Sequence, residues 1–320
     1  PWDVQFNEMN FYIVPETYAL LQTLRGSYRQ AARKIDLHPE FWLWSIVERR
    51  AWFVKEVMVS HMPKEILTGD LIAGGRFNIQ TSLCLKSEEQ KNYDEAVLGK
   101  NGARKKMKWF HDHGYGNAGA TSGHLIPDHE RALKIGWKGI YEDLAARFEA
   151  LSDSDKKEPA GDQLRAMLTS ATMARDLAAK YKDLCLDLAA TEGDPTRRHE
   201  LLQMAQNLAR VPWEPARTFW EALQALWVNH MLIMSDENYP GPGTSFGRID
   251  QYLLPYWEHS ISRGMDRDFG KEILKCFWVH CNTVYDAMIR NGNQGITAGF
   301  GQLITLSGMG ANKQDLTNDL

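Results

Sequence analysis

Apolar side chains recur at helical spacing along most of this 320-residue chain. Intervals of three and four residues run through 41–60, 162–191, 249–261 and 266–290. Such spacing places the apolar positions on one face of a helix and predicts a buried stripe in each segment. The pattern therefore predicts a mainly helical chain whose helices pack through their apolar faces.

Capping residues set the ends of two further helices. Asp128 is a favourable N-cap for a short helix that ends at Gly136, and a second helix is expected over 140–151. Thr218 and Glu221 form a capping box that opens another helix. The predicted buried face of that helix comprises Phe219, Ala222, Leu223, Leu226, Trp227 and His230.

Strand signals are fewer than helix signals. Short apolar runs at 71–75 and 301–308 are bounded by glycine, which is typical of fully buried strands, and 230–235 is a third candidate. Long helices alternating with short buried strands favour an α/β or barrel-like architecture over a helical bundle.

Composition narrows the functional classes. A net charge of −4 without a basic stripe argues against nucleic-acid binding, and no apolar run approaches the ~20 residues of a membrane span. No signal peptide is recognisable, and Cys84, Cys185, Cys276 and Cys281 form no CxxC pair, so we expect a reduced, cytoplasmic protein. The start without Met and the few strands suggest a piece of a larger protein.

Common enzyme motifs do not fit. Residues 114–119, GYGNAG, match GxGxxG, but a charged segment precedes them and no helix follows directly, which argues against a dinucleotide site. The nearby histidines straddle a glycine-rich loop without an HExxH pattern, which favours separate histidines and no metal site. Glycine-bearing loops at 114–123, 241–247 and 292–301 let backbone approach a ligand, although plain turns explain each loop equally well.

Four segments together resemble the pyruvate formate-lyase-like glycyl radical enzymes. GDLIAGG at 69–75 is similar to an early strand of that family, and SGHLIPDHERALKIGWKGI at 122–140 is similar to its Gly-His and Pro-Asp segment. RTFWEALQALW at 217–227 resembles a family helix. GTSFGRIDQYLLPYWEHSI at 243–261 matches the family's Ser-x-Gly-Arg-x-Asp-Gln-Tyr signature almost position for position.

The resemblance implies that residues 1–320 are the N-terminal portion of a single domain. That domain is an α/β barrel of ten strands in two five-stranded halves, wrapped by helices. It implies thiyl-radical chemistry, a glycyl radical installed by a separate S-adenosylmethionine and iron–sulfur activating enzyme, a homodimer and an anaerobic organism. None of the four cysteines lies in the family's Gly-Cys-hydrophobic-Glu context, and Arg-Val-x-Gly is absent. We therefore expect no catalytic residue or metal here and no activity from this part alone.

Two loops are expected to contribute to the substrate pocket. In the family, the loop before the Pro-Asp helix and the loop before Ser-x-Gly-Arg face the barrel interior. The resemblance therefore implies pocket roles for Tyr115, Asn117, His124, Pro242, Gly243, Thr244 and Phe246, and structural roles for Asp128, Ser245, Arg248 and Asp250.

Pro242-Gly243 stands where the family's polyol dehydratases carry a His-Ser pair, which argues against a polyol because buried hydroxyls need partners. The aromatic content favours an apolar or aromatic small-molecule substrate. The leading hypothesis is a C–C lyase that decarboxylates arylacetates. The alternatives are an aryl- or alkylsuccinate synthase that uses fumarate, a C–S, C–N or C–O lyase, and a helical interaction protein without catalysis.

Overall fold

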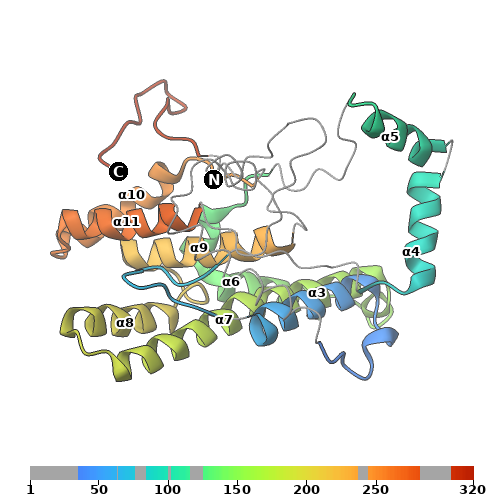
Figure 1. Cartoon of the computed structure of the whole chain (residues 1–320), viewed down its shortest axis with the longest axis horizontal. Helices are drawn as coiled ribbons and strands as arrows, with labels where there is room; N and C mark the ends of the chain where they lie inside the picture. The colour runs from blue at the N-terminus through green and yellow to red at the C-terminus, as the bar shows by residue number, and fades with distance from the viewer. Residues whose placement is uncertain are drawn as a thin grey trace, which may run out of the picture.

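The structure is a computed structural model that describes residues 35–62, 64–75, 84–99, 102–115, 125–236, 244–281 and 304–320. Figure 1 shows a layered assembly of helices, with α9 near its centre and α4 and α5 standing apart from the main body. The α-helices are α3 (Ile46–Glu56), α4 (Ser87–Tyr93), α5 (Ala103–Asp112), α6 (His129–Glu149), α7 (Pro159–Thr191), α8 (Pro195–Leu208), α9 (Phe219–Asp236), α10 (Ile249–Ser262) and α11 (Arg267–Cys281).

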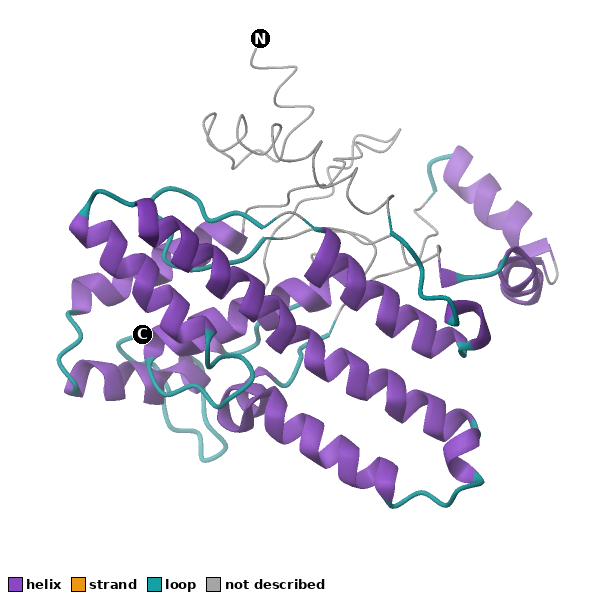
Figure 2. Ribbon diagram, turned by 90° about the horizontal axis from the view of Figure 1, so that it is seen from below, coloured by secondary structure: helices purple, strands orange, loops and turns teal. Residues whose placement is uncertain are grey.

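The helices form two packed groups that share α9. The long helix α7 packs against α3, α6 and α8, while α9 packs against α10 and α11 and also contacts α6, α7 and α8. Figure 2 shows these helices in stacked layers. No helix of the described residues is long and apolar enough to span a bilayer.

The segment 41–60, expected to be one helix, is divided. A 3₁₀ turn at Phe41–Leu43 precedes α3, and a π-helical turn at Val57–His61 follows it. Ser45 and Glu48 form a capping box that fixes the start of α3 at Ile46. The expectation of one continuous helix is therefore wrong at its N-terminal end, because the capping box satisfies the first amides of a new helix there.

Gly136 divides α6 as the sequence predicts. Its φ of +66° interrupts helical geometry, and the second half begins directly after it rather than at residue 140. The amides of Trp137 and Lys138 donate to the carbonyl oxygens of Pro212 and Trp213, both at 2.9 Å. The break therefore docks the middle of α6 onto the loop before α9.

The strand predictions fare less well. Residues 230–235 are helical and belong to α9, so that prediction is wrong; an apolar run there reflects a helix buried on nearly every side. Within the described ranges, β pairing is limited to three isolated bridges: Leu125 with Thr244, Arg248 with Thr305, and Met309 with Asp315. The described residues thus show the helical layer, and the barrel itself is not seen in them.

The predicted strand at 71–75 is extended and buried but has side chains as its partners. The Gln224 amide donates to the Ala73 carbonyl oxygen and accepts from the Ala73 amide, both at 2.9 Å. Trp220 Nε1 donates to the Leu71 carbonyl oxygen at 2.7 Å. On the next residue, the Ile72 amide donates to an Asp70 carboxylate oxygen at 3.0 Å. These bonds satisfy buried backbone groups without a neighbouring strand.

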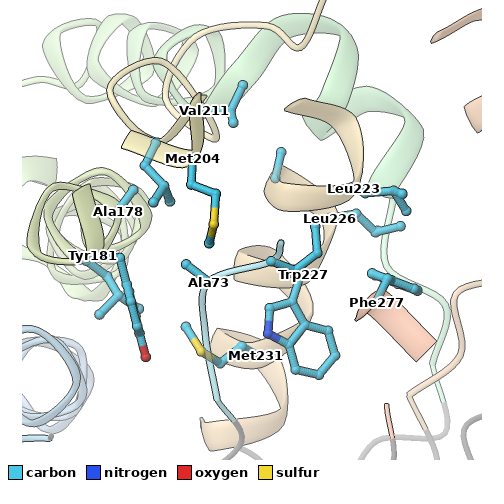
Figure 3. Close-up of a cluster of buried hydrophobic side chains, with 14 of the residues drawn as sticks. Ala73, Ala178, Tyr181, Met204, Val211, Leu223, Leu226, Trp227, Met231 and Phe277 are labelled. Atoms are coloured by element: carbon cyan, nitrogen blue, oxygen red, sulfur yellow. The ribbon is translucent and has the colours of Figure 1, made fainter. Parts of the chain in front are cut away.

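The core lies where α9 crosses this extended segment (Figure 3). All six residues of the predicted buried face of α9 are fully buried, which confirms that prediction. Trp227 meets Phe277 of α11 nearly edge-on, with ring centroids 5.9 Å apart. A Cβ at Gly74 would lie 2.5 Å from Trp227 Nε1, so glycine permits this close approach.

Candidate functional site

Two loops meet beside the N-terminal ends of α6 and α10. Leu125 and Thr244 form a parallel bridge, and the Ser245 amide donates to the Leu125 carbonyl oxygen at 3.0 Å. Ser245 Oγ accepts from the Gly247 amide at 3.0 Å, and Gly247 turns the chain with a φ of +66°. We call this contact between residues 125 and 244–245 the loop junction. It brings together two segments that the sequence analysis assigned to one pocket.

A buried aromatic cluster lies behind the loop junction. The Phe246 ring centroid is 4.1 Å from that of His230, 5.8 Å from that of His129 and 5.1 Å from that of Phe277. Burial lowers the pKa of His129 to about 4, against a smaller opposing effect of the Asp128 carboxylate. His129 is therefore a neutral imidazole at neutral pH. The cluster places aromatic rings directly behind the loop junction.

A cleft of about 550 Å³ opens between the start of α6 and the start of α10. Pro127 and His129 line one side, and Phe246, Gln251 and Tyr252 line the other. Tyr252 Oη donates to the Phe246 carbonyl oxygen at 3.0 Å, and burial raises the pKa of this phenol. Tyr252 is thus a neutral hydroxyl committed to the loop backbone, which fixes Phe246 in place.

Apolar side chains stay uncovered at the loop junction. Leu125 is 41% exposed and Ile126 is 66% exposed, although both lie next to a buried cluster. Leu306, on the segment that pairs beside α10, is also exposed. Grouped apolar residues exposed on a rigid loop mark a surface that contacts a ligand or another part of a protein.

Arg248 and Asp250 attach residues 304–309 to the start of α10. Arg248 Nη2 donates to the Ser307 carbonyl oxygen at 2.7 Å, and the Thr305 amide donates to the Gly247 carbonyl oxygen at 3.0 Å. The buried Asp250 carboxylate accepts from the Ser307 amide at 2.9 Å. The two side chains therefore fasten residues 304–309 to the start of α10.

The predicted site residues divide into three groups. Thr244 and Phe246 are fully buried at the loop junction, where Ser245 accompanies them, and Asp128 caps α6 through the Arg131 amide at 3.0 Å. Tyr115 is 70% exposed and stacks on Trp109 at the end of α5, with centroids 5.6 Å apart. Figure 1 shows α5 well away from α9 and α10, so the structure does not bring Tyr115 to the loop junction. The remaining predicted residues, Asn117, His124, Pro242 and Gly243, lie outside the described residues.

Sequence reasoning missed the contribution of His129 and Tyr252. His129 is one of the histidines near the glycine-rich loop, and it directly follows the Pro-Asp pair that precedes α6. Tyr252 lies four residues after Arg248 in the signature, on the first turns of α10. Their positions within the matched segments were the available signal, since each lies in the first turn of a helix that follows one of the two loops.

The described residues include four cysteines and no cluster of metal-ligating side chains. None of the four cysteines forms a disulfide, and burial raises the pKa of Cys185 to about 12 and that of Cys276 to about 11. Such thiols stay protonated at neutral pH. No three His, Cys, Asp or Glu side chains of the described residues are arranged to hold a metal ion.

The family model "Pyruvate formate lyase-like" matches residues 94–320, which include the loop junction and the aromatic cluster. The chain therefore belongs to the pyruvate formate lyase-like family, and the resemblance predicted from four sequence segments is confirmed.

The chain spans only part of the length of the relatives that it matches. Isethionate sulfite-lyase of Nitratidesulfovibrio vulgaris is 33% identical over 203 residues, which cover 61% of this chain and 24% of that protein. Indoleacetate decarboxylase of Tractidigestivibacter scatoligenes is 49% identical over 88 residues, covering 28% of this chain and 10% of that protein. The matched part thus amounts to about a quarter of the sulfite-lyase's length.

A solved structure supports the fold. A glycyl radical enzyme from Archaeoglobus fulgidus superposes with a TM-score of 0.70 at 22% identity, over 95% of this chain and 45% of that one. The likeness indicates that the helices described above share the fold of the matching part of that enzyme, which is 45% of its chain.

Proposed function

We propose that this chain is the N-terminal portion of a glycyl radical lyase and supplies one wall of its substrate barrel. The observation that carries the proposal is the loop junction, where two segments of the matched family meet in front of a buried aromatic cluster. The exposed apolar side chains of Leu125 and Ile126 support it, because a barrel interior completed by further chain would cover them.

Within this class, decarboxylation of an arylacetate is the first candidate reaction. Phe246 and the neutral imidazole of His129 line the cleft between α6 and α10 with aromatic rings, which suits a flat apolar substrate body. The 49% identity to indoleacetate decarboxylase supports this choice, although that match covers only 88 residues. Pro242-Gly243 also offers no side-chain partner for substrate hydroxyls.

Cleavage of a C–S bond is the second candidate. The sulfite-lyase match supports it, because it extends over 203 residues at 33% identity. The succinate synthase alternative draws no support from the relatives named above. In either lyase, a separate S-adenosylmethionine and iron–sulfur activating enzyme would install the glycyl radical outside this chain. A homodimer in the cytoplasm of an anaerobe is part of the same proposal.

The test uses the full-length protein with its activating enzyme under anaerobic conditions. We expect a glycyl radical signal by electron paramagnetic resonance, and none when residues 1–320 alone receive the same treatment. The activated protein is then given indoleacetate and isethionate separately, and carbon dioxide and sulfite release are measured. Loss of the radical signal in the full-length protein would contradict the class, whereas sulfite release alone would replace the first candidate by the second.

A further inference from the structure

A second and larger cleft lies between α3, α6, α7 and α9, on the other side of the Pro127–His129 turn. It has a volume of about 970 Å³ and is lined by stripes from α3, α6, α7 and α9. The α3 stripe consists of Val47, Arg50, Ala51 and Val54, which share one helical face. A volume near the upper end of small-molecule sites and a mainly aliphatic lining suit an apolar ligand body. We call this space the helical cleft.

Two buried polar groups that line the helical cleft lack partners. Asn229 is 2% exposed, and its Oδ1 accepts from Trp137 Nε1 at 2.6 Å while its Nδ2 has no hydrogen-bond partner. His129 Nε2, also buried, has none either. A buried donor without an acceptor is costly, so this end of the cleft favours a ligand that brings an oxygen acceptor.

The mouth of the helical cleft, unlike its buried end, carries exposed charged side chains. Arg131 and Arg147 on α6 are more than half exposed, and both approach the carboxylate of Asp143, at 3.9 and 3.1 Å. Two guanidinium groups thus share one carboxylate at the mouth. The excess of positive charge favours a carboxylate at the mouth.

The distance between these two ends sets the ligand's length. Asn229 is bonded to Trp137, and Asp143 and Arg147 follow six and ten residues later on the same helix. At 1.5 Å per residue, the carboxylate-binding mouth lies about 9–15 Å along α6 from the buried donors. This span fits a chain of about ten atoms.

We propose that the helical cleft binds an apolar oxo-carboxylate. Its carboxylate meets the arginines of the mouth, its chain lies between α3 and α7, and its inner carbonyl oxygen accepts from Asn229 Nδ2. The site is separate from the proposed radical chemistry and does not depend on it.

The test is calorimetric titration of 9-oxodecanoate into the unactivated full-length protein. Decanoate lacks the inner acceptor and 2-decanone lacks the carboxylate, so both should bind more weakly. Asn229→Asp keeps the acceptor for Trp137 but replaces the donor, and should weaken 9-oxodecanoate binding by about tenfold, with a smaller effect on decanoate. Arg147→Gln should weaken both carboxylates by about threefold and leave 2-decanone unchanged.

Two further variants guard against misfolding. Arg198→Gln changes an exposed arginine of α8 outside the cleft and should bind as the parent does. Ala132→Phe fills the cleft from a half-exposed position and should abolish binding while the thermal unfolding midpoint stays close to the parent's. No binding of 9-oxodecanoate at millimolar concentration, or equal binding by Asn229→Asp or Ala132→Phe, would overturn the proposal. Because no radical is formed, neither result bears on the lyase assignment.

Discussion

Gln224 shows how much one side chain can stabilise in this molecule. Its amide is the hydrogen-bond partner of both backbone groups of Ala73, although the two residues are 151 positions apart. Gln224→Met keeps the volume but leaves two buried backbone groups unpaired, so we expect the free energy of unfolding to fall by about 2–4 kcal/mol. Urea unfolding of the full-length protein measures this change. Gln206→Met, at an exposed position of α8, is the matched control, and equal losses in both variants would contradict the prediction.

His280 makes stability depend on pH. Burial by itself would lower its pKa, but the Asp70 carboxylate at 2.7 Å and the Ile72 carbonyl oxygen outweigh burial and raise the pKa above 6.5. The stabilisation is therefore complete below the pKa of the unfolded chain, about 6.5, and is lost as pH rises through the higher folded value. We expect the free energy of unfolding to decline from pH 6.5 upward in the parent protein.

The comparison with His280→Gln isolates this effect. Glutamine keeps a donor but does not titrate, so the difference in unfolding free energy between parent and variant should shrink above pH 6.5. His129 contributes a slope of opposite sign below its ordinary range, since its pKa is lowered to about 4, but both proteins share it. His259→Gln, at an exposed site, serves as control. A pH-independent difference for His280→Gln would refute the prediction.

At the level of single residues, the sequence predicted which side chains are buried better than it predicted their hydrogen-bond partners. Phe219 and Trp227 follow from helical spacing, because a stripe needs only local periodicity. The roles of Trp220 and Gln224 as backbone partners depend on where residues 71–73 lie, and local spacing carries no information about that. Asp128 was predictable as a cap because capping involves neighbours in sequence.

Gly136 governs the path of α6. Its φ of +66° suits glycine alone, and a Cβ there would overlap the Trp213 carbonyl of the loop before α9. Gly136→Ala should therefore lower the free energy of unfolding by about 2 kcal/mol or more. Gly193→Ala is the control, since Gly193 has open space around it and an ordinary φ, and it should be neutral or slightly stabilising. Thermal unfolding of both variants decides the matter, and similar midpoints would count against the prediction.

Helices were predicted well where the apolar residues followed helical spacing throughout the segment. The spacing over 162–191 gives most of α7, and the spacing over 249–261 gives α10. The stretch 230–235 was misjudged because a helix buried on nearly every side shows no polar face, and a short apolar run then looks like a buried strand. Residues 301–308 illustrate the other limit: the described part, 304–308, has a single bridged residue, Thr305.

At the scale of the whole molecule, the exposure of residues 304–309 leads to a prediction about hydrogen exchange. Here they rest on Arg248 and Asp250 while Leu306 and Met309 are 59% and 70% exposed. If further chain completes a barrel, these residues become covered, and their amides should exchange with deuterium at least about tenfold more slowly in the full-length protein. Mass spectrometry of peptides from residues 1–320 alone and from the full-length protein gives the comparison. The exposed helix face around His199 should exchange alike in both, and equal rates at 304–309 would argue against the barrel.

At this scale the sequence predicted family and helical content, but not the site's full composition. The signature at 243–261 was specific enough to identify the family, because it fixes a loop and the helix behind it together. The loop junction itself needed the structure, since the bridge between Leu125 and Thr244 joins segments 119 residues apart. We expect the bond-breaking residues of the proposed enzyme outside this chain, because none of its four cysteines lies in the family's Gly-Cys-hydrophobic-Glu context.

The side chains gathered around Leu71, Ile72 and Ala73 limit how any sheet can grow. Trp220 and Gln224 occupy the backbone groups that face α9, and Asp70 and His280 occupy those of Ile72. A neighbouring strand cannot add along these three residues without displacing four side chains from the core. The Gly75 amide is also taken, by Met231 Sδ at 3.0 Å, so this stretch of extended backbone is a closed edge for any sheet that forms beside it.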